Sequence, residues 1–173
     1  GLLVDTVIDG LSAAQVKTVR YCLGDMDLQY CRGCMRCQLT GECYQQDDMQ
    51  MLAVELREAD IVILAAPSYW GNVPGQLKVF IDRNLPWCDT CPGGARIPKG
   101  KKGGAIALRA GKSQAENLKI IAEVEHYFSH LQIEPVARLT AEGVLDRSAL
   151  EKMTWKLAEA YQLGVGFGSR GHE

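Results

Sequence analysis

Apolar residues recur along this chain with two different periods, and together they predict alternating strands and helices. The most apolar stretch, residues 60–67, is a continuous run typical of a strand buried on both faces of a parallel sheet. Further strands are predicted over residues 16–23, 104–111 and 133–143. Helical periodicity predicts helices between them, over residues 2–14, 48–59, 75–84, 115–131 and 146–167.

This alternation predicts one α/β domain over residues 1–173, with a doubly wound parallel sheet and helices on both faces. Asp47 is the expected N-cap of the helix that follows it, and the glycine-rich stretch 164–173 is expected to fray. In such sheets, ligands bind at the C-terminal ends of the strands. Residues 67–75 and 109–113 both follow predicted strands, so we expect a ligand site between these two loops.

Composition narrows the possible partners and the compartment. A net charge of −2 gives no reason to expect a nucleic-acid or acidic-membrane partner. No apolar run approaches the roughly 20 residues that span a bilayer, and no signal peptide is visible. Seven cysteines would leave one thiol unpaired in a secreted domain, so a reducing, cytoplasmic compartment is expected.

Four of the cysteines lie in the segment "CRGCMRCQLTGEC", residues 31–43, which we call the cysteine segment. Three interpretations are open. The compact spacing is typical of [4Fe–4S] ligands, and four thiolates also suit tetrahedral zinc, although a run this dense would crowd one ion. The thiols could instead pack as small hydrophobic groups on one side of a short helix, or act as redox-active thiols. The candidate metal ligands are Cys31, Cys34, Cys37 and Cys43.

Other possible ligands carry weaker signals. Cys88 and Cys91 form a second C-x-x-C pair, within a loop rich in Pro and Gly at residues 86–102. His126 and His130 are four positions apart, a metal-ligand spacing on a helix. No third histidine lies beside them in the sequence, so we expect a solvent-exposed helix face. Cys22 falls in a predicted strand and is expected in the core.

Two motifs resemble a known family. The stretch "IVILAAPSYWGNVPGQLKVFIDR", residues 61–83, closely matches the flavin loop and following helix of the flavodoxin-like, NADPH-dependent FMN reductase family. The stretch "CRGCMRCQLTGECYQQDDM" resembles the cysteine segment of the iron–sulfur flavoprotein branch, including the acidic pair before the next helix. The resemblance extends over about residues 15–140.

The resemblance implies that FMN binds at the strand ends. Aromatic side chains would form a wall for the ring, Gly71 would let backbone N–H groups approach it, and Asn72 would hydrogen-bond its pyrimidine part. Arg109 or Lys112 would stabilise negative charge near the N1–C2 edge. The implied cofactor-binding residues are Pro67, Ser68, Tyr69, Trp70, Gly71, Asn72, Arg109, Ala110 and Gly111.

The family also has a first strand and a loop that holds the FMN phosphate at a helix N-terminus. Nothing of this kind precedes Leu2, so we expect both to lie upstream of these residues, and no phosphate contact is assigned.

The function implied is that of an FMN-dependent oxidoreductase or electron-transfer flavoprotein, with NAD(P)H or a ferredoxin-type protein as donor. A [4Fe–4S] cluster would relay electrons to FMN, and no side chain need act as acid or base. A small molecule or redox protein is the expected electron partner, and a homodimer or homotetramer is expected, with Trp70, Trp87 and Met35 at the interface. The alternative is a non-catalytic flavodoxin-like module whose cysteine segment binds zinc or senses redox state.

Overall fold

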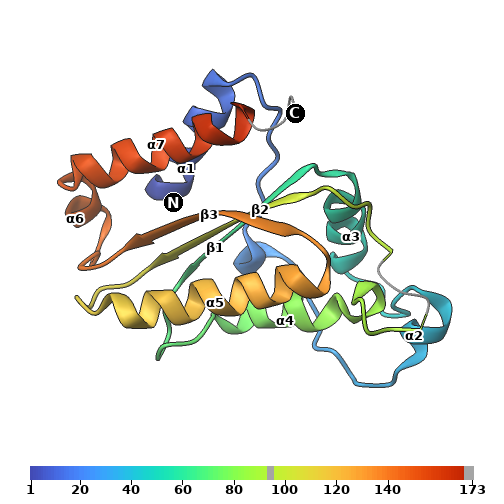
Figure 1. Ribbon diagram of the computed structural model, residues 1–173. Coiled ribbons are helices and arrows are strands. Elements are labelled where there is room, and N and C mark those ends of the chain that lie inside the picture. The colour runs from blue at the N-terminus through green and yellow to red at the C-terminus, as the bar shows by residue number, and fades with distance from the viewer. Residues whose placement is uncertain (93–95, 170–173) are drawn as a thin grey trace.

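A parallel sheet of three strands forms the centre of the molecule in the computed structural model, which describes residues 1–92 and 96–169 (Figure 1). The strands are β1 (Ile61–Pro67), β2 (Lys102–Leu108) and β3 (Glu134–Ala141), in the order β1-β2-β3. β2 is buried almost throughout, whereas most of β1 is only half-buried. As predicted, apolar side chains of β1 pack on both faces of the sheet, with Val62 and Leu64 against one core and Ile61 and Ile63 against the other. They are only half-buried because β1 pairs with β2 alone within the described residues.

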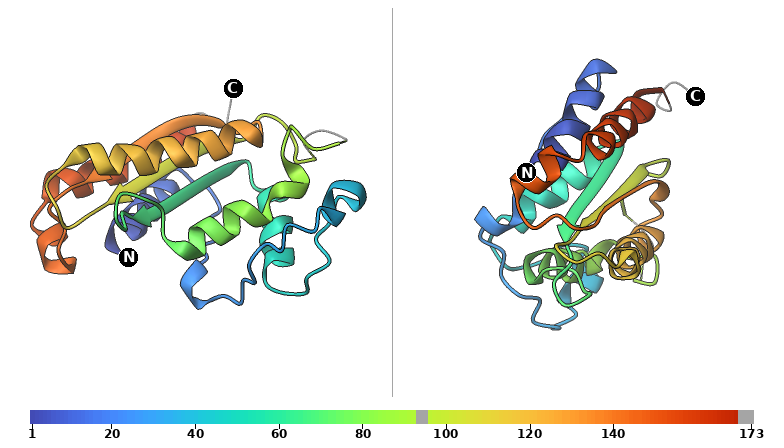
Figure 2. Two further views of the ribbon diagram at one scale, coloured as in Figure 1. Left: turned by 90° about the horizontal axis from the view of Figure 1, so that it is seen from below. Right: turned by 90° about the vertical axis from the view of Figure 1, so that its left-hand side faces the viewer.

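Helices cover both faces of this sheet, as the sequence predicted. α1 (Leu2–Ala13), α6 (Arg147–Glu151) and α7 (Thr154–Ser169) lie on one face. α3 (Met49–Glu58), α4 (Gly75–Arg83) and α5 (Gln114–His130) pack on the other. Figure 2 shows α1 and α7 on one side of the strands, with α4 and α5 on the opposite side. The architecture is therefore the expected doubly wound α/β arrangement.

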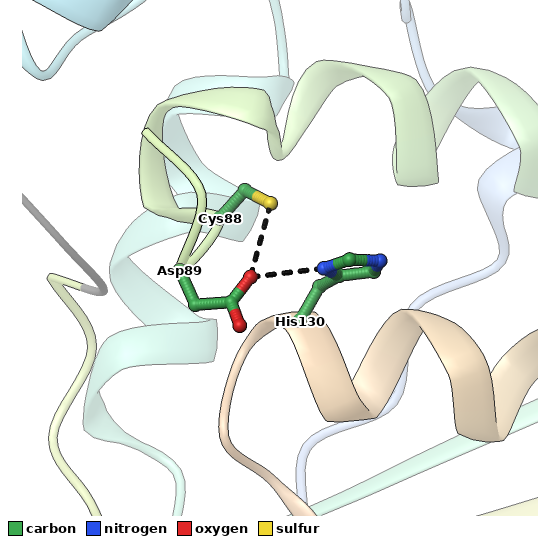
Figure 3. Close-up of side chains that lie close together, drawn as sticks. All are labelled: Cys88, Asp89 and His130. Atoms are coloured by element: carbon green, nitrogen blue, oxygen red, sulfur yellow. Dashed lines mark hydrogen bonds and ion pairs between the residues drawn. The ribbon is translucent and has the colours of Figure 1, made fainter. Parts of the chain in front are cut away.

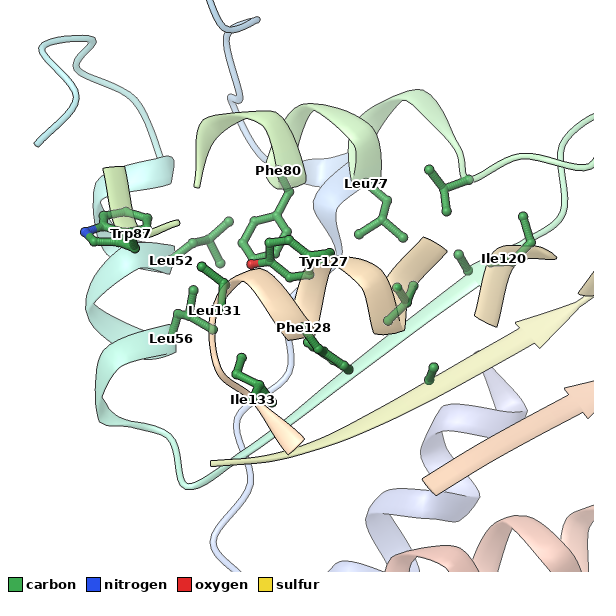
Figure 4. Close-up of a cluster of buried hydrophobic side chains, with 14 of the residues drawn as sticks. Leu52, Leu56, Leu77, Phe80, Trp87, Ile120, Tyr127, Phe128, Leu131 and Ile133 are labelled. Atoms are coloured by element: carbon green, nitrogen blue, oxygen red, sulfur yellow. The ribbon is translucent and has the colours of Figure 1, made fainter. Parts of the chain in front are cut away.

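The larger hydrophobic core lies between the sheet and the α3–α4–α5 face (Figure 4). Phe128 of α5 is fully buried, and Phe80 of α4 packs edge-on against Tyr127 with ring centroids 6.0 Å apart. Trp87, in the short 3-10 helix η2 (Leu85–Trp87), belongs to this core and is only 5% exposed. The expectation that Trp87 anchors a subunit interface was therefore wrong.

On the other face, α1 and α7 cross at very close range because glycines line the crossing. A Cβ on Gly164 would lie 2.2 Å from the carbonyl oxygen of Val7, and one on Gly10 would lie 2.1 Å from that of Tyr161. The stretch that we expected to fray is therefore helical and packed up to Ser169, with Phe167 buried. Residues 170–173 of the predicted tail lie outside the described residues.

Two further element predictions differ from the structure. Residues 16–22 are extended but form no strand, since no strand of the described chain lies beside them, and the 3-10 helix η1 (Leu23–Asp25) follows. Cys22 is exposed there rather than in the core. The final helix is divided into α6 and α7. Asp146 caps α6 by accepting a hydrogen bond from the Ala149 N–H, and the chain turns at Met153 before α7 begins.

In the described part of the chain, none of the helices combines the length and apolarity needed to cross a membrane.

Candidate functional site

Three loops gather at the C-terminal end of the sheet, where the strand arrows point in Figure 1. They follow β1, β2 and β3 and comprise residues 67–74, 109–113 and 142–146. Backbone hydrogen bonds link each loop to the next. They run from the Ser68 N–H to the Leu108 carbonyl (2.8 Å), from Arg109 to Ala141 (3.0 Å), from Gly143 to Gly111 (2.9 Å) and from Val144 to Arg109 (2.9 Å).

The first loop is a tight hairpin with an unusual residue at its tip. Tyr69 and Asn72 exchange two backbone hydrogen bonds of 3.0 Å, and the residues between them have positive φ: 56° at Trp70 and 73° at Gly71. Positive φ at both central positions defines a type I′ turn, which favours Asn or Gly. A bulky side chain with positive φ is strained, and Trp70 is also 99% exposed.

Glu116 joins the first two loops from the first turn of α5. Its Oε2 lies 2.9 Å from Nη1 of Arg109 and accepts a hydrogen bond of 3.5 Å from the Ser68 hydroxyl. A Cβ on Gly71 would lie 3.6 Å from Cγ of Glu116, so the turn itself approaches this side chain. Glu116 is not predicted from the sequence, where the available signal is its position three residues after Ser113, the N-cap of α5.

Arg109 is largely buried beneath the second loop. Besides Glu116, it contacts the Ser113 carbonyl, to which it donates a hydrogen bond of 3.2 Å. A Cβ on Gly111 would lie 2.6 Å from the Arg109 guanidinium, so glycine makes room for this side chain. Lys112 and Ala110 are exposed on the same loop. The structure therefore brings the predicted residues 67–72 and 109–111 together at one edge, with the charge of Arg109 paired.

The cysteine segment lies at the opposite end of the molecule, beyond the N-terminal ends of the strands (Figures 1 and 2). Its helix α2 (Arg36–Thr40) is only five residues long, and left-handed residues bend the chain on both sides, with φ of 61° at Gly33, 60° at Met35 and 79° at Gly41. Cys31 and Cys34 are exposed and precede α2. The arrangement of three thiols on one side of a short helix was therefore wrong.

All four thiols of the cysteine segment are free, and those of Cys31, Cys34 and Cys43 lie within electrostatic range of Cys37. Burial raises the pKa of the Cys37 thiol, and the nearby Cys43, Cys31 and Cys34 raise it further. No three of these sulfurs lie within 4.8 Å of one another in the described chain. A tetrahedral zinc ion with Zn–S bonds of about 2.3 Å needs sulfurs only about 3.8 Å apart. Within the described residues, these thiols are therefore not already arranged as the ligands of one tetrahedral ion.

A buried ion pair closes the base of the cysteine segment. Arg83 of α4 holds Asp47 through two contacts, of 2.6 Å (Nη1 to Oδ2) and 3.0 Å (Nη2 to Oδ1), and both side chains are almost completely buried. The Asp47 carboxylate also accepts hydrogen bonds from the backbone N–H groups of Gln29 (2.9 Å) and Met49 (3.2 Å). Asp48, not Asp47, is the N-cap residue of α3.

The electrostatics of this ion pair reach the cysteines. Burial opposes the charge of Asp47, but the hydrogen bonds and charge of Arg83, together with the backbone N–H groups, lower the pKa of that carboxyl overall. Burial likewise opposes the charge of Arg83, whereas Asp47 and then Cys43 raise its pKa above the usual value. A buried positive charge therefore lies beside one of the four candidate ligands.

The second C-x-x-C pair contacts the cysteine segment. Cys91 is buried, donates its S–H to the Leu85 carbonyl (2.7 Å) and accepts a hydrogen bond of 3.7 Å from Gln38 of α2. Burial raises the pKa of Cys91, and Cys88 nearby adds to the increase. Cys91 is therefore a packing residue between η2 and α2.

Comparison with known proteins identifies the family of this chain. A sequence model of the NADPH-dependent FMN reductase family matches residues 1–138. An iron–sulfur flavoprotein of Archaeoglobus fulgidus is 32% identical over 167 residues, which cover 92% of this chain and 73% of that protein. One of Methanocaldococcus jannaschii is 30% identical over 151 residues, covering 83% of this chain and 74% of that protein.

Solved structures show the same flavodoxin-like fold. The NAD(P)H:quinone oxidoreductase of Methanothermobacter marburgensis is 17% identical, has a TM-score of 0.73, and matches 96% of this chain and 88% of its own. An FMN-dependent NADH-azoreductase of Bacillus anthracis, solved in complex with FMN, is 16% identical and has a TM-score of 0.67. The match covers 99% of this chain and 90% of the azoreductase chain. The chain belongs to the NADPH-dependent FMN reductase family, in its iron–sulfur flavoprotein branch.

Proposed function

We propose that residues 67–72 and 109–111 of this NAD(P)H-dependent FMN oxidoreductase hold the flavin ring, and that its cysteine segment holds a [4Fe–4S] cluster. FMN, when bound, supplies the exchange of a hydride or of single electrons with NAD(P)H or a ferredoxin-type donor. The proposal depends most on one observation. Trp70 is strained and 99% exposed at the tip of a loop that the rest of the structure holds rigidly.

A flavin ring stacked against this loop would explain both the strain and the exposure of Trp70. Strained residues persist where function requires them, and covering an exposed indole with another flat ring lowers the free energy of the system. Tyr69 extends the same wall at 60% exposure, and Gly71 adds no side chain of its own at the tip of the turn. Asn72 is held by a hydrogen bond of 3.2 Å from its Nδ2 to the Trp70 carbonyl, which leaves its Oδ1 to accept from the pyrimidine edge.

The second loop would contribute position more than charge. Because Glu116 pairs with Arg109, the net charge that this pair presents to a ring is small. We assign Arg109, Ala110 and Gly111 to backbone contacts along the ring, and the exposed Lys112 to the stabilisation of negative charge at the N1–C2 edge.

We assign the cluster ligands to Cys31, Cys34, Cys37 and Cys43, four free thiols whose compact spacing along the sequence is typical of [4Fe–4S] ligands. The Arg83 guanidinium, although paired with Asp47, can also donate a hydrogen bond to the Cys43 thiolate. The spacing and the iron–sulfur flavoprotein relatives favour a cluster over the alternative zinc-binding or redox-sensing module.

The relay between cluster and flavin would then run between copies of the chain. In one chain α4 separates the flavin loop from the cysteine segment, and its nine residues span about 13 Å. A homodimer or homotetramer can bring the cysteine segment of one copy to the flavin loop of another. We propose a small molecule or a redox protein as the final electron partner.

The test uses anaerobically purified protein and three variants. Trp70→Ala should weaken FMN binding by about 10-fold, since one stacking partner is lost. Cys37→Ala should lose iron and sulfide while keeping FMN, and Cys22→Ala, an exposed cysteine outside both sites, should keep both. A colourless protein that neither binds FMN nor oxidises NADPH would overturn the flavin assignment. Wild-type protein that contains no iron, and whose zinc Cys37→Ala loses, would favour the alternative module.

A further inference from the structure

Three metal-ligand side chains meet at the end of α5, outside the two sites above. Cys88 and Asp89 come from the loop after η2, and His130 comes from the last turn of α5 (Figure 3). Their ligand atoms all lie within 4.8 Å of one another, which no other group of three such residues achieves in the described chain. The sequence predicts only an exposed helix face at His130. The fold brings the carboxylate of Asp89, 41 positions away, into contact with it.

The backbone fixes this arrangement. The Asp89 N–H donates a hydrogen bond of 2.8 Å to the carbonyl of His130 itself, so the loop is attached to the helix end. The Cys91 N–H donates a hydrogen bond of 3.0 Å to the Cys88 carbonyl and closes a turn that holds Cys88 in place. The two segments therefore present their side chains to one point without relying on the side-chain contacts alone.

We propose that Cys88, Asp89 and His130 bind one Zn²⁺ ion. One sulfur, one nitrogen and one oxygen ligand suit this borderline ion. With bond lengths of about 2.3 Å to sulfur and 2.0 Å to nitrogen and oxygen, tetrahedral geometry needs S–O separations of about 3.5 Å and N–O separations of about 3.3 Å. The structure has 3.5 Å between Cys88 Sγ and Asp89 Oδ1, and 2.9 Å between Asp89 Oδ1 and His130 Nδ1.

Charge and access agree with this assignment. A thiolate, a carboxylate and a neutral imidazole neutralise the two positive charges of the ion. The side chains of His130 and Asp89 are 38% and 39% exposed, so zinc reaches them from solvent and a water molecule completes the coordination. His130 also lies at the C-terminus of α5, where the helix dipole favours a cation.

His126 is the positioning residue of this site. Its Nε2 lies 3.3 Å from Nε2 of His130, with the rings at 83° and their centroids 4.7 Å apart. When the Nε2–H of His130 donates to His126, Nδ1 of His130 carries no proton and faces Asp89 and the metal. Such a hydrogen bond fixes both the tautomer and the ring orientation of a zinc-bound histidine.

The experiment must separate this site from the cysteine segment. We would titrate Zn²⁺ into anaerobically prepared full-length protein against a chromophoric chelator, and determine the ligands by zinc X-ray absorption. Wild type and Cys37→Ser should both bind one equivalent in a site with a single sulfur ligand. His130→Asn and Cys88→Ser should each weaken that binding at least about 100-fold, and His126→Asn about 10-fold.

Two results would overturn the proposal. One is wild-type protein that binds no zinc in a single-sulfur site. The other is zinc that His130→Asn and Cys88→Ser retain but Cys37→Ser loses, which would place the ion in the cysteine segment. Circular dichroism of each variant in metal-free buffer should match wild type, since all three ligands lie at the surface. Cys88→Ser and His130→Asn lie on different elements, so either one suffices if the other unfolds.

Discussion

At Trp70 the local conformation and the amino acid disagree, and this disagreement can be measured. Trp70→Asn places a residue that tolerates positive φ at the first central position of the type I′ turn. We expect the free energy of unfolding of the apoprotein to increase by about 1 kcal/mol, because the strain of a bulky side chain is relieved. Urea denaturation followed by circular dichroism measures this change.

The same substitution should weaken FMN binding by roughly 10-fold, measured by quenching of flavin fluorescence. Trp155→Asn is the matched control, because that indole is 64% exposed on α7 and is not among the proposed flavin-binding residues. It should leave FMN affinity unchanged. Equal losses of affinity in the two variants would mean that Trp70 has no specific role.

The buried pair of Asp47 and Arg83 gives a second residue-level prediction. Asp47→Asn leaves the guanidinium buried without its counter-charge, which should cost roughly 3 kcal/mol of the free energy of unfolding. Asp82→Asn is the control on α4, since its ion pair with Lys78 is exposed and should cost less than about 0.5 kcal/mol. Urea denaturation of both variants at neutral pH makes the comparison, and similar losses would contradict the prediction.

The pH dependence of the same pair has a definite sign. The folded protein lowers the pKa of Asp47, so the resulting stabilisation is complete above the unfolded value of about 3.9 and is lost as the pH falls through the folded pKa. The stability difference between wild type and Asp47→Asn should therefore shrink below about pH 4. Denaturation at a series of pH values tests this, and a difference that grows on acidification would refute it.

Residue identities predicted part of each site and missed what only the fold brings together. Residues 67–72 and the four cysteines were found because their local spacing already carries the chemistry. Glu116 and Arg83 were missed because their partners are 48 and 36 positions away. Asp47 was predicted to be a helix cap, a local role, whereas a distant arginine determines its actual role.

At the scale of elements, the crossing of α1 and α7 gives a prediction with an internal control. Gly164→Ala adds a methyl group 2.2 Å from a backbone oxygen and should destabilise the fold by about 1–3 kcal/mol, because the two helices must separate. Gly166→Ala, two residues along the same helix, meets open space and should be neutral or stabilising by up to about 1 kcal/mol. Thermal unfolding of both variants decides, and similar destabilisation would show that the crossing is not tight.

Elements were predictable where their hydrophobic period was strong. The sequence predicted the helices α1, α3, α4 and α5, because each has an apolar face that packs on the sheet. It predicted the three strands because their apolar side chains contribute to the two cores. The sequence wrongly predicted a strand at residues 16–22, because hydrophobic periodicity does not show whether a neighbouring strand is present to pair with it. It also failed at the glycines of α7, which in isolation suggest flexibility but here allow a close helix crossing.

For the whole molecule, we predict an oligomer in solution. The exposed Trp70, in the first flavin loop, and the half-exposed Met35, in the cysteine segment, remain the proposed interface residues. Light scattering of the holoprotein should give at least twice the chain mass of 19.0 kDa. Trp70→Asn should shift the equilibrium toward monomer at low micromolar concentration. A monomeric wild-type protein at that concentration would contradict both the interface and the relay between copies.

The ion pair at the base of the cysteine segment also affects how the protein would survive without iron. In a zinc finger, the metal supplies the free energy that folds the chain. Here the ends of the segment are already joined by Asp47, Arg83 and the backbone around Gln29, while Cys31 and Cys34 remain open to solvent. Chelation of the iron should therefore lower the unfolding temperature by only a few degrees. We therefore expect that a cluster destroyed by oxygen can be reassembled in the protein while the chain stays folded.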